Sequence, residues 1–135
     1  MPLEYELGTP SEWLRRAKSN LIRAKQPKPE EVLWEDLCFD AQRAVEKALK
    51  GLLLFYGIPF RFVHDIAELL TRLEQGGISL PEDVRRAAAL SDYAVVARYP
   101  GPMESVTEEE YQQAIALAEI TVCWVEQLIQ AGNLD

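Results

Sequence analysis

The chain has 135 residues, of which 48% are hydrophobic and 27% are charged. This length is enough for one domain with a hydrophobic core but hardly for two, so we expect a single domain with its core at about residues 9–130. The net charge of −8 argues against a protein whose main task is nonspecific binding to a phosphate backbone. No apolar run approaches the roughly 20 residues needed to cross a bilayer, and the first residues lack a secretory signal. We therefore expect no membrane association and a cytoplasmic location, with Cys38 and Cys123 as reduced thiols.

The first predicted helix begins at a capping box. Thr9 is the expected N-cap, Pro10 occupies the first turn and Glu12 closes the box. Apolar residues follow at helical spacing to about Lys25. Pro27 and Pro29 end this helix, because neither can continue the hydrogen-bond ladder, and Pro29 is well placed to begin the next one.

The stretch Trp34–Tyr56 predicts one long central helix, free of proline and rich in Ala and Leu. Its apolar residues cover about half of the circumference, which suits a helix contacted by several neighbours. Ala41, Ala44 and Ala48 would let another helix approach closely. Phe39 and Leu54 lie off this apolar face and could pack under a neighbour or join a two-fold interface.

Three further helical segments follow in the sequence. A shorter helix is predicted from His64 to Gln75 and ends at Gly76 and Gly77. Another begins around Ser79–Pro81 and runs to about Leu90, and residues 93–97 could add one or two turns. A second capping box at Thr107–Glu110 begins the last helix, which is expected to end near Gln130. The predicted fold is all-α, a mainly antiparallel bundle of four to five helices.

Charge is distributed unevenly along the chain. Residues 13–28 contain six bases and no acid, and residues 101–135 contain seven acids and no base. Two interpretations stay open from sequence: the first and last helices are neighbours whose charges offset one another, or the basic segment binds a nucleotide, RNA or an acidic partner.

The polar residues of the central helix suggest a mostly solvated face. Glu46 and Lys50 have the favourable i,i+4 order for an ion pair. Gln42 is different, because it sits at the edge of the apolar face, where a polar group needs a hydrogen-bond partner. We assign Gln42 and Glu46 structural polar roles.

Three segments together resemble one family. They are Cys-Phe-Asp-Ala-Gln-Arg-Ala-Val-Glu-Lys-Ala-Leu-Lys-Gly-Leu-Leu at 38–53, His-Asp-Ile-Ala-Glu-Leu-Leu at 64–70 and Leu-Ser-Asp-Tyr-Ala-Val-Val-Ala-Arg-Tyr-Pro at 90–100. The first is similar to the signature helix of HEPN domains, and the last resembles the Ala-Arg-Tyr-Pro subgroup of small prokaryotic HEPN proteins. The resemblance runs from about Trp13 to Gln130 and implies a helical bundle that commonly forms a homodimer.

Several kinds of site lack support in the sequence. There is no phosphate-binding Gly-x-x-x-x-Gly-Lys loop and no Glu-x-x-His pair of a di-iron bundle. Two distant cysteines and the one histidine do not make a zinc site. We expect neither a metal nor a cofactor.

The resemblance raises the question of RNA cleavage, because many HEPN proteins are metal-independent ribonucleases with an Arg-x4–6-His motif. Arg98 occupies the position of the motif's arginine, but the positions where the histidine belongs are Met103, Glu104 and Ser105. The motif is broken. A composite site of Arg98 and His64 stays as the catalytic alternative, while His64 is expected to be a capping or packing residue. Arg98 itself could instead pair with a carboxylate of the central helix.

The sequence favours a HEPN-like protein that is not a ribonuclease. The resemblance implies a homodimer that partners a minimal nucleotidyltransferase, as in toxin–antitoxin or nucleotide-handling pairs, and that binds a nucleotide or RNA. The residues expected to meet the nucleotide or the partner are Arg43, Lys47, Lys50, Tyr93, Arg98 and Tyr99. The alternative is a ribonuclease toxin that uses Arg98 with His64.

Overall fold

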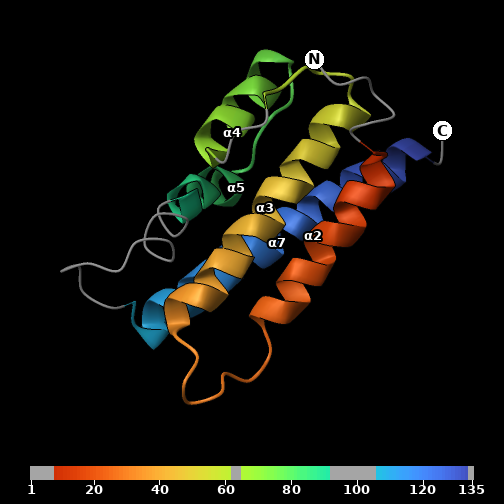
Figure 1. Ribbon diagram of the computed structural model, residues 1–135. Coiled ribbons are helices and arrows are strands. Elements are labelled where there is room, and N and C mark those ends of the chain that lie inside the picture. Colours follow the sequence, from red (N-terminus) through yellow and green to blue (C-terminus); the bar gives the residue numbers. More distant parts are fainter. Residues whose placement is uncertain (1–7, 62–64, 92–105, 134–135) are drawn as a thin grey trace.

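The computed structural model describes residues 8–61, 65–91 and 106–133, and these contain helices and no strand (Figure 1). The all-α prediction is confirmed. In chain order the elements are α2 (Pro10–Ala24), α3 (Trp34–Phe55), α4 (Ile66–Gln75), α5 (Glu82–Arg86), the 3-10 helix η1 (Ala87–Ser91) and α7 (Glu108–Asn133).

The three long helices α2, α3 and α7 pack side by side and form the body of the bundle (Figure 1). α2 is antiparallel to α3. α3 and α7 run in the same direction: Tyr111 and Trp34, near their first residues, stack with ring centroids 4.7 Å apart. Near their last residues, Gly132 faces the ring of Phe55. The chain returns to the starting end of α3 through the shorter helices.

α3 is the centre of the molecule, as its apolar pattern predicted. It buries 14 of its 22 residues, and Ala41, Ala44 and Ala48 have no exposed surface. α2 and α7 cover it on two sides, and α4 and η1 contact it as well. α4 contributes Ile66, Leu69 and Leu73 to the same core.

Two predicted helix caps, Thr9 and Thr107, are confirmed. The side chain of Thr9 accepts a hydrogen bond from the amide of Glu12 at 3.1 Å. At Thr107 the capping box is complete, because Thr107 and Glu110 each accept a bond from the other's backbone amide.

The predicted start of the central helix at Trp34 is confirmed, and Pro29, the other candidate for this start, lies in the preceding loop. The helix α4 begins at Ile66, two residues after the predicted start. Its cap is Asp65, whose carboxylate accepts a bond from the amide of Ala67 at 3.0 Å.

α7 differs from the expectation about apolar length. From Glu108 to Gly132 it is long and apolar enough to cross a membrane by length and composition alone, with a mean hydropathy of 1.3 over its most apolar window. In the described structure its residues Ala118, Val122 and Val125 are buried in the bundle core. A central helix of a globular bundle meets the same criterion.

Candidate functional site

One row of polar side chains on α3 faces the interior. Gln42, Glu46 and Lys50 follow one another at four-residue spacing, and each is at most 5% exposed. The amide of Gln42 donates to one carboxylate oxygen of Glu46 at 2.9 Å, and the ammonium of Lys50 donates to the other at 2.7 Å. The predicted partner for Gln42 and the predicted ion pair are thus both present.

Burial of this row corrects the interpretation of a solvated face. Burying an ion pair costs solvation energy, so such groups need hydrogen bonds from every side. The ammonium of Lys50 also lies 6.0 Å from the ring centroid of Trp13. The ammonium of Lys50 is therefore buried and hydrogen-bonded to Glu46. Its role in binding a nucleotide or partner stays a prediction.

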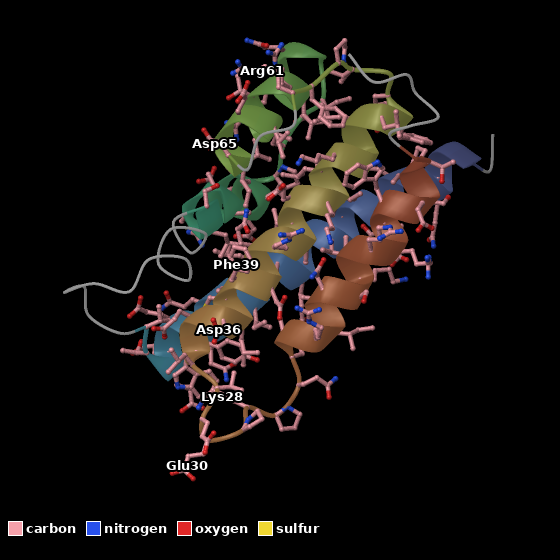
Figure 2. The ribbon with its side chains drawn as sticks, viewed as in Figure 1. Lys28, Glu30, Asp36, Phe39, Arg61 and Asp65 are labelled. Atoms are coloured by element: carbon pink, nitrogen blue, oxygen red, sulfur yellow. The ribbon has the colours of Figure 1, made fainter. Side chains whose placement is uncertain are left out.

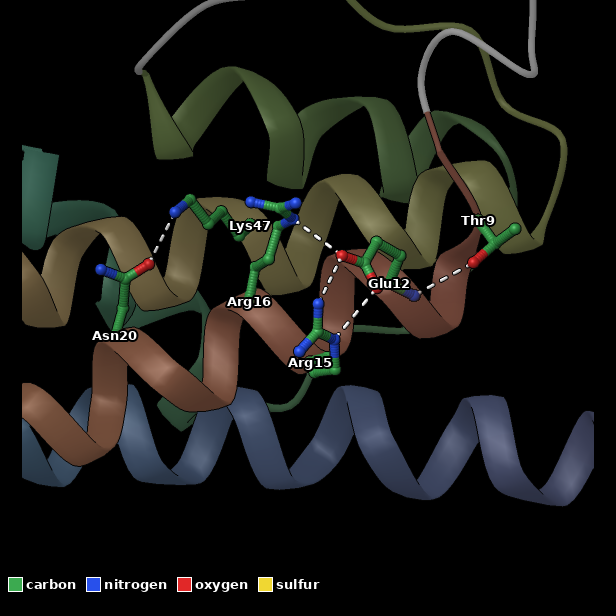
Figure 3. A network of polar contacts seen from close by, with 6 residues as sticks. All are labelled: Thr9, Glu12, Arg15, Arg16, Asn20 and Lys47. Atoms are coloured by element: carbon green, nitrogen blue, oxygen red, sulfur yellow. Dashed lines mark hydrogen bonds and ion pairs between the residues drawn. The ribbon is translucent and has the colours of Figure 1, made fainter.

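The side of α3 that faces α2 carries a different set of groups. Lys47 on α3 contacts Asn20 on α2 and is affected by the charges of Arg43 on α3 and of Arg16 and Arg23 on α2. We call these five residues the α2–α3 cationic cluster. The ammonium of Lys47 donates to the side-chain oxygen of the buried Asn20 at 2.8 Å, and Arg16 extends over the same side of the two helices (Figure 3). The guanidinium of Arg43 lies 5.7 Å from the ring centroid of Phe39, which is labelled on α3 in Figure 2.

The cluster perturbs its own lysine. Burial lowers the pKa of Lys47 below its ordinary value, and the charges of Arg43, Arg16 and Arg23 lower it further, whereas Glu46 opposes them. Lys47 is half-buried beside three arginines, so burial and charge repulsion both destabilise its protonated form. Such perturbed groups are frequent at functional sites.

Two carboxylates neutralise part of the cluster. Asp40 accepts a hydrogen bond from Arg23 at 2.9 Å. Glu12 is shared between Arg15 and Arg16, at 2.9 and 3.0 Å (Figure 3). Among the residues that the structure describes, no carboxylate pairs with Arg43 or Lys47. The cluster therefore keeps a local positive surplus on a protein whose net charge is −8.

The basic first helix also contacts the acidic last one. Lys18 pairs with Glu126 at 2.6 Å and Lys25 with Glu119 at 2.7 Å. Charge offset between neighbouring helices thus explains part of the asymmetry seen in the sequence. Arg16 and Arg23 lie outside this contact, since they face α3.

Four predicted site residues, His64, Tyr93, Arg98 and Tyr99, lie outside the described residues. Arg61 and Asp65, on either side of residues 62–64, lie beside α4 (Figure 2), and Arg61 pairs with Glu68 at 2.9 Å. Of the two carboxylates suggested as partners of Arg98, Asp40 pairs with Arg23 and Glu46 pairs with Lys50 among the residues that the structure describes. Over the described ranges, no group of three or more His, Cys, Asp or Glu residues is arranged to hold a metal ion.

Arg16 and Asn20 are site residues that the sequence analysis did not single out. A signal was present, because Arg16, Asn20 and Arg23 recur at steps of four and three and so share one face of a helix. The sequence does not show how α2 is positioned along α3, and this position brings the face beside Arg43 and Lys47.

The fold and this polar arrangement define a small all-α bundle built around one central helix with a buried polar row. The model of the HEPN domain family matches residues 10–128, nearly the whole chain. The chain belongs to the HEPN domain family.

Two solved structures are similar along most of their length. One is ST0689, an archaeal HEPN homologue, with 30% identity and a TM-score of 0.71, covering 90% of this chain and 98% of that chain. The other is TT1696 from Thermus thermophilus, with 34% identity and a TM-score of 0.76, covering 87% of this chain and 96% of that chain. The comparison with curated proteins gives no match.

Proposed function

We propose that this HEPN protein is not itself a ribonuclease, and that it forms a homodimer, partners a minimal nucleotidyltransferase and binds a nucleotide. The observation that carries this proposal is the position of the chain's one histidine. His64 precedes Arg98 in the sequence, and Met103, Glu104 and Ser105 stand where the ribonuclease motif has its histidine.

The missing imidazole matters for the chemistry of RNA cleavage. A metal-independent cut needs a group that moves a proton near neutral pH, and a guanidinium that stabilises the charge developing on phosphorus. Arg98 can supply the second function. Methionine and serine carry no group that titrates near neutral pH, and glutamate offers a carboxylate in place of the imidazole.

The α2–α3 cationic cluster supports the nucleotide part of the proposal. Arg43 and Lys47, both expected to meet a nucleotide or partner, form no ion pair with a carboxylate among the described residues, although the charge of Glu46 acts on Lys47. Arg98, Tyr93 and Tyr99 are proposed to complete the binding surface. Phe39 and Leu54 are half-buried and do not belong to the core cluster, which agrees with a place at the two-fold interface.

A cytoplasmic site of action is part of the same proposal. Cys38 is buried, Cys123 is exposed, and neither forms a disulfide. A reducing compartment keeps such thiols reduced.

Co-purification tests the partnership. The protein is expressed from its native operon with an affinity tag, and we expect a stoichiometric complex with a small nucleotidyltransferase encoded beside it. Size-exclusion chromatography with light scattering then gives the mass of the free protein, which should be that of a dimer. A monomeric protein that captures no nucleotidyltransferase would contradict the proposal.

The alternative function is a ribonuclease toxin of a toxin–antitoxin pair, with Arg98 and His64 as the catalytic residues. The presence of Arg98 at the motif's arginine position favours it. Purified protein is incubated with RNA beside the Arg98→Ala and His64→Ala variants. We expect no cleavage above the variants, and cleavage lost in both variants would establish the alternative.

A further inference from the structure

We infer that the α2–α3 cationic cluster is a binding site for the terminal phosphate of a nucleotide, with Arg43, Lys47 and Arg16 as its ligands. This site rests on the proposed nucleotide binding and deepens it, because it names the group that is bound and adds α2 to the binding surface. The first observation is geometric: Lys47 on α3 lies 2.8 Å from Asn20 on α2, and Arg16 extends over the same side of the two helices (Figure 3). The charges of Arg43, Arg16 and Arg23 act on this lysine, although like charges repel one another.

The acids around the cluster leave a defined surplus. Asp40 offsets Arg23, and Glu12 is shared between Arg15 and Arg16. Arg43 and Lys47 remain without a carboxylate among the described residues, and Arg16 is only partly offset. A phosphate monoester carries a charge of about −1.5 to −2 at neutral pH, which matches this surplus.

The donors also suit a phosphate. A guanidinium presents paired N–H groups that match two phosphate oxygens, and an ammonium acts as a compact point charge. Asn20 has a positioning role, because its side-chain oxygen, 2.8 Å from the ammonium of Lys47, holds the lysine between the two helices. Asn20 is itself 8% exposed, so this contact is shielded from solvent.

A single phosphate group fits the surroundings better than an RNA backbone. The described residues beside the cluster on α3 include the acids Asp36 and Asp40, and the whole chain carries a charge of −8. An extended polyanion would meet these acids, whereas one terminal phosphate would not.

Isothermal titration calorimetry of the full chain with AMP tests the inference directly. We expect AMP binding that weakens as salt is raised from about 50 to about 200 mM, and no binding of adenosine, which lacks the phosphate. Inorganic phosphate should compete with AMP. Equal binding of adenosine and AMP, or no AMP binding at all, would overturn the inference.

Two substitutions locate the site. Arg43→Gln and Lys47→Gln should each weaken AMP binding about tenfold or more, because each removes a charged hydrogen-bond donor. The matched control is Lys18→Gln, which removes one positive charge from the neighbouring helix α2, on the side that pairs with Glu126. It should change the affinity less than about twofold. A similar loss in all three variants would show that general attraction, not this site, binds AMP.

Folding and ligand source are controlled separately. Lys47→Gln could disturb Asn20, so the unfolding midpoint of each variant is measured. Arg43→Gln alone suffices for the test, because Arg43 makes no hydrogen bond to Asn20 within the described part of the chain. An oligoribonucleotide without terminal phosphates is titrated as a second ligand, to separate a terminal phosphate from a backbone phosphate. If it binds more tightly than AMP, the backbone diester is the ligand and the inference as stated is wrong.

The two proposals can fail independently. A protein that captures a nucleotidyltransferase but does not bind AMP refutes this inference and leaves the partnership intact. A protein that binds AMP through Arg43 and Lys47 but captures no nucleotidyltransferase supports this inference and refutes the partnership.

Discussion

Glu46 and Lys50 form an ion pair whose two side chains are each 6% exposed, on the helix that every other long helix contacts. Gln42 supplies a hydrogen bond to the second carboxylate oxygen. An ion pair in such a place is retained at a solvation cost, and its stabilising effect depends on both partners being present.

Removal of one partner of the Glu46–Lys50 pair should therefore lower the stability of the protein strongly. We expect Lys50→Met to lower the free energy of unfolding by about 3–5 kcal/mol, because it leaves the Glu46 carboxylate buried without the ammonium. The double variant Glu46→Gln with Lys50→Met should lose less than Lys50→Met alone, since no buried charge remains and Gln42 keeps an acceptor. Urea denaturation measures all three proteins.

The exposed pair of Lys18 and Glu126 gives the control for this prediction. Lys18→Met should change the free energy of unfolding by less than about 1 kcal/mol, because exposed pairs are screened by solvent. Equal losses in Lys18→Met and Lys50→Met would contradict the role assigned to burial.

Tyr111 gives a pH-dependent prediction. Its hydroxyl donates to the carbonyl oxygen of Ala24 at 2.6 Å, and burial, followed by Cys38, raises the pKa of Tyr111 above its ordinary value. Tyr111→Phe keeps the ring beside Trp34 but leaves the Ala24 carbonyl without this donor. We expect a loss of about 1–3 kcal/mol at pH 7.

The sign of the pH effect follows from the raised pKa of Tyr111. Above pH about 10 the unfolded chain releases the phenolic proton before the folded chain does, so the contribution of Tyr111 to stability falls as pH rises. The gap between the wild-type protein and Tyr111→Phe should narrow above that pH. Denaturation at pH 7, 9 and about 10.5 measures it, and a constant or widening gap would contradict the assignment.

Residue-level features were predictable where the partner lies on the same helix. The Glu46–Lys50 pair follows from four-residue spacing, and the need of Gln42 for a partner follows from its place at the edge of the apolar face. Their burial and the contact between Lys47 and Asn20 depend on how α2 is placed on α3. Spacing within one segment carries no information about that placement.

At the scale of helices, the closest approach lies where α2 meets α3. A Cβ on Gly51 would lie 2.9 Å from the Cβ of Trp13 and 3.3 Å from the carbonyl oxygen of Pro10. Both contacts involve atoms fixed to the backbone of α2. Glycine at this position thus permits the first turn of α2 to rest on α3.

In the substitution Gly51→Ala, helix propensity favours alanine, whereas packing against α2 opposes it. Alanine is favoured over glycine in a helix interior by about 1 kcal/mol. We expect a net loss of stability of about 1–3 kcal/mol nevertheless, because the first turn of α2 must move to admit the methyl group. Thermal and urea unfolding measure the change.

Gly132→Ala is the matched control in α7. Its Cβ would meet the far edge of the half-buried Phe55 ring at Cζ, and this ring can turn aside. We expect a smaller loss than for Gly51→Ala. A stabilised Gly51→Ala protein would show that α2 shifts freely on α3.

Helix limits were well predicted where a side chain caps the backbone. Thr9 and Thr107 both cap as expected, since the Ser/Thr-x-x-Glu pattern is read within one turn. The start of α3 at Trp34 was predicted from the apolar pattern alone, since Leu33 precedes it without a side-chain cap. The packing of Trp34 on Tyr111 at this helix start is not revealed by local sequence.

For the molecule as a whole, family resemblance and apolar periodicity together predicted one all-α bundle with α3 at its centre. The shared direction of α3 and α7 did not follow from sequence. The helices α4, α5 and η1 lie between α3 and α7 in the sequence, and they contact α3, α7 or each other. The same limit applies to the candidate site, because the cationic cluster is a property of two helices in register.

Cys38 can report on the stability of the whole bundle. It has no exposed surface and lies on α3, whereas Cys123 on α7 is exposed. In a Cys123→Ser variant the remaining thiol can react only when α3 separates from its neighbours. We expect labelling by a thiol reagent at least about a thousandfold slower than in urea-unfolded protein, because folded domains open rarely.

The wild-type protein gives the internal comparison for this measurement. One thiol per chain, Cys123, should react rapidly, and the second should follow at the slow rate found for Cys123→Ser. Gly51→Ala, which disturbs the α2–α3 contact beside the same helix, should speed the slow phase and leave the fast phase unchanged. Two fast thiols in the native protein would mean that α3 is not enclosed, and the central position of this helix would then be wrong.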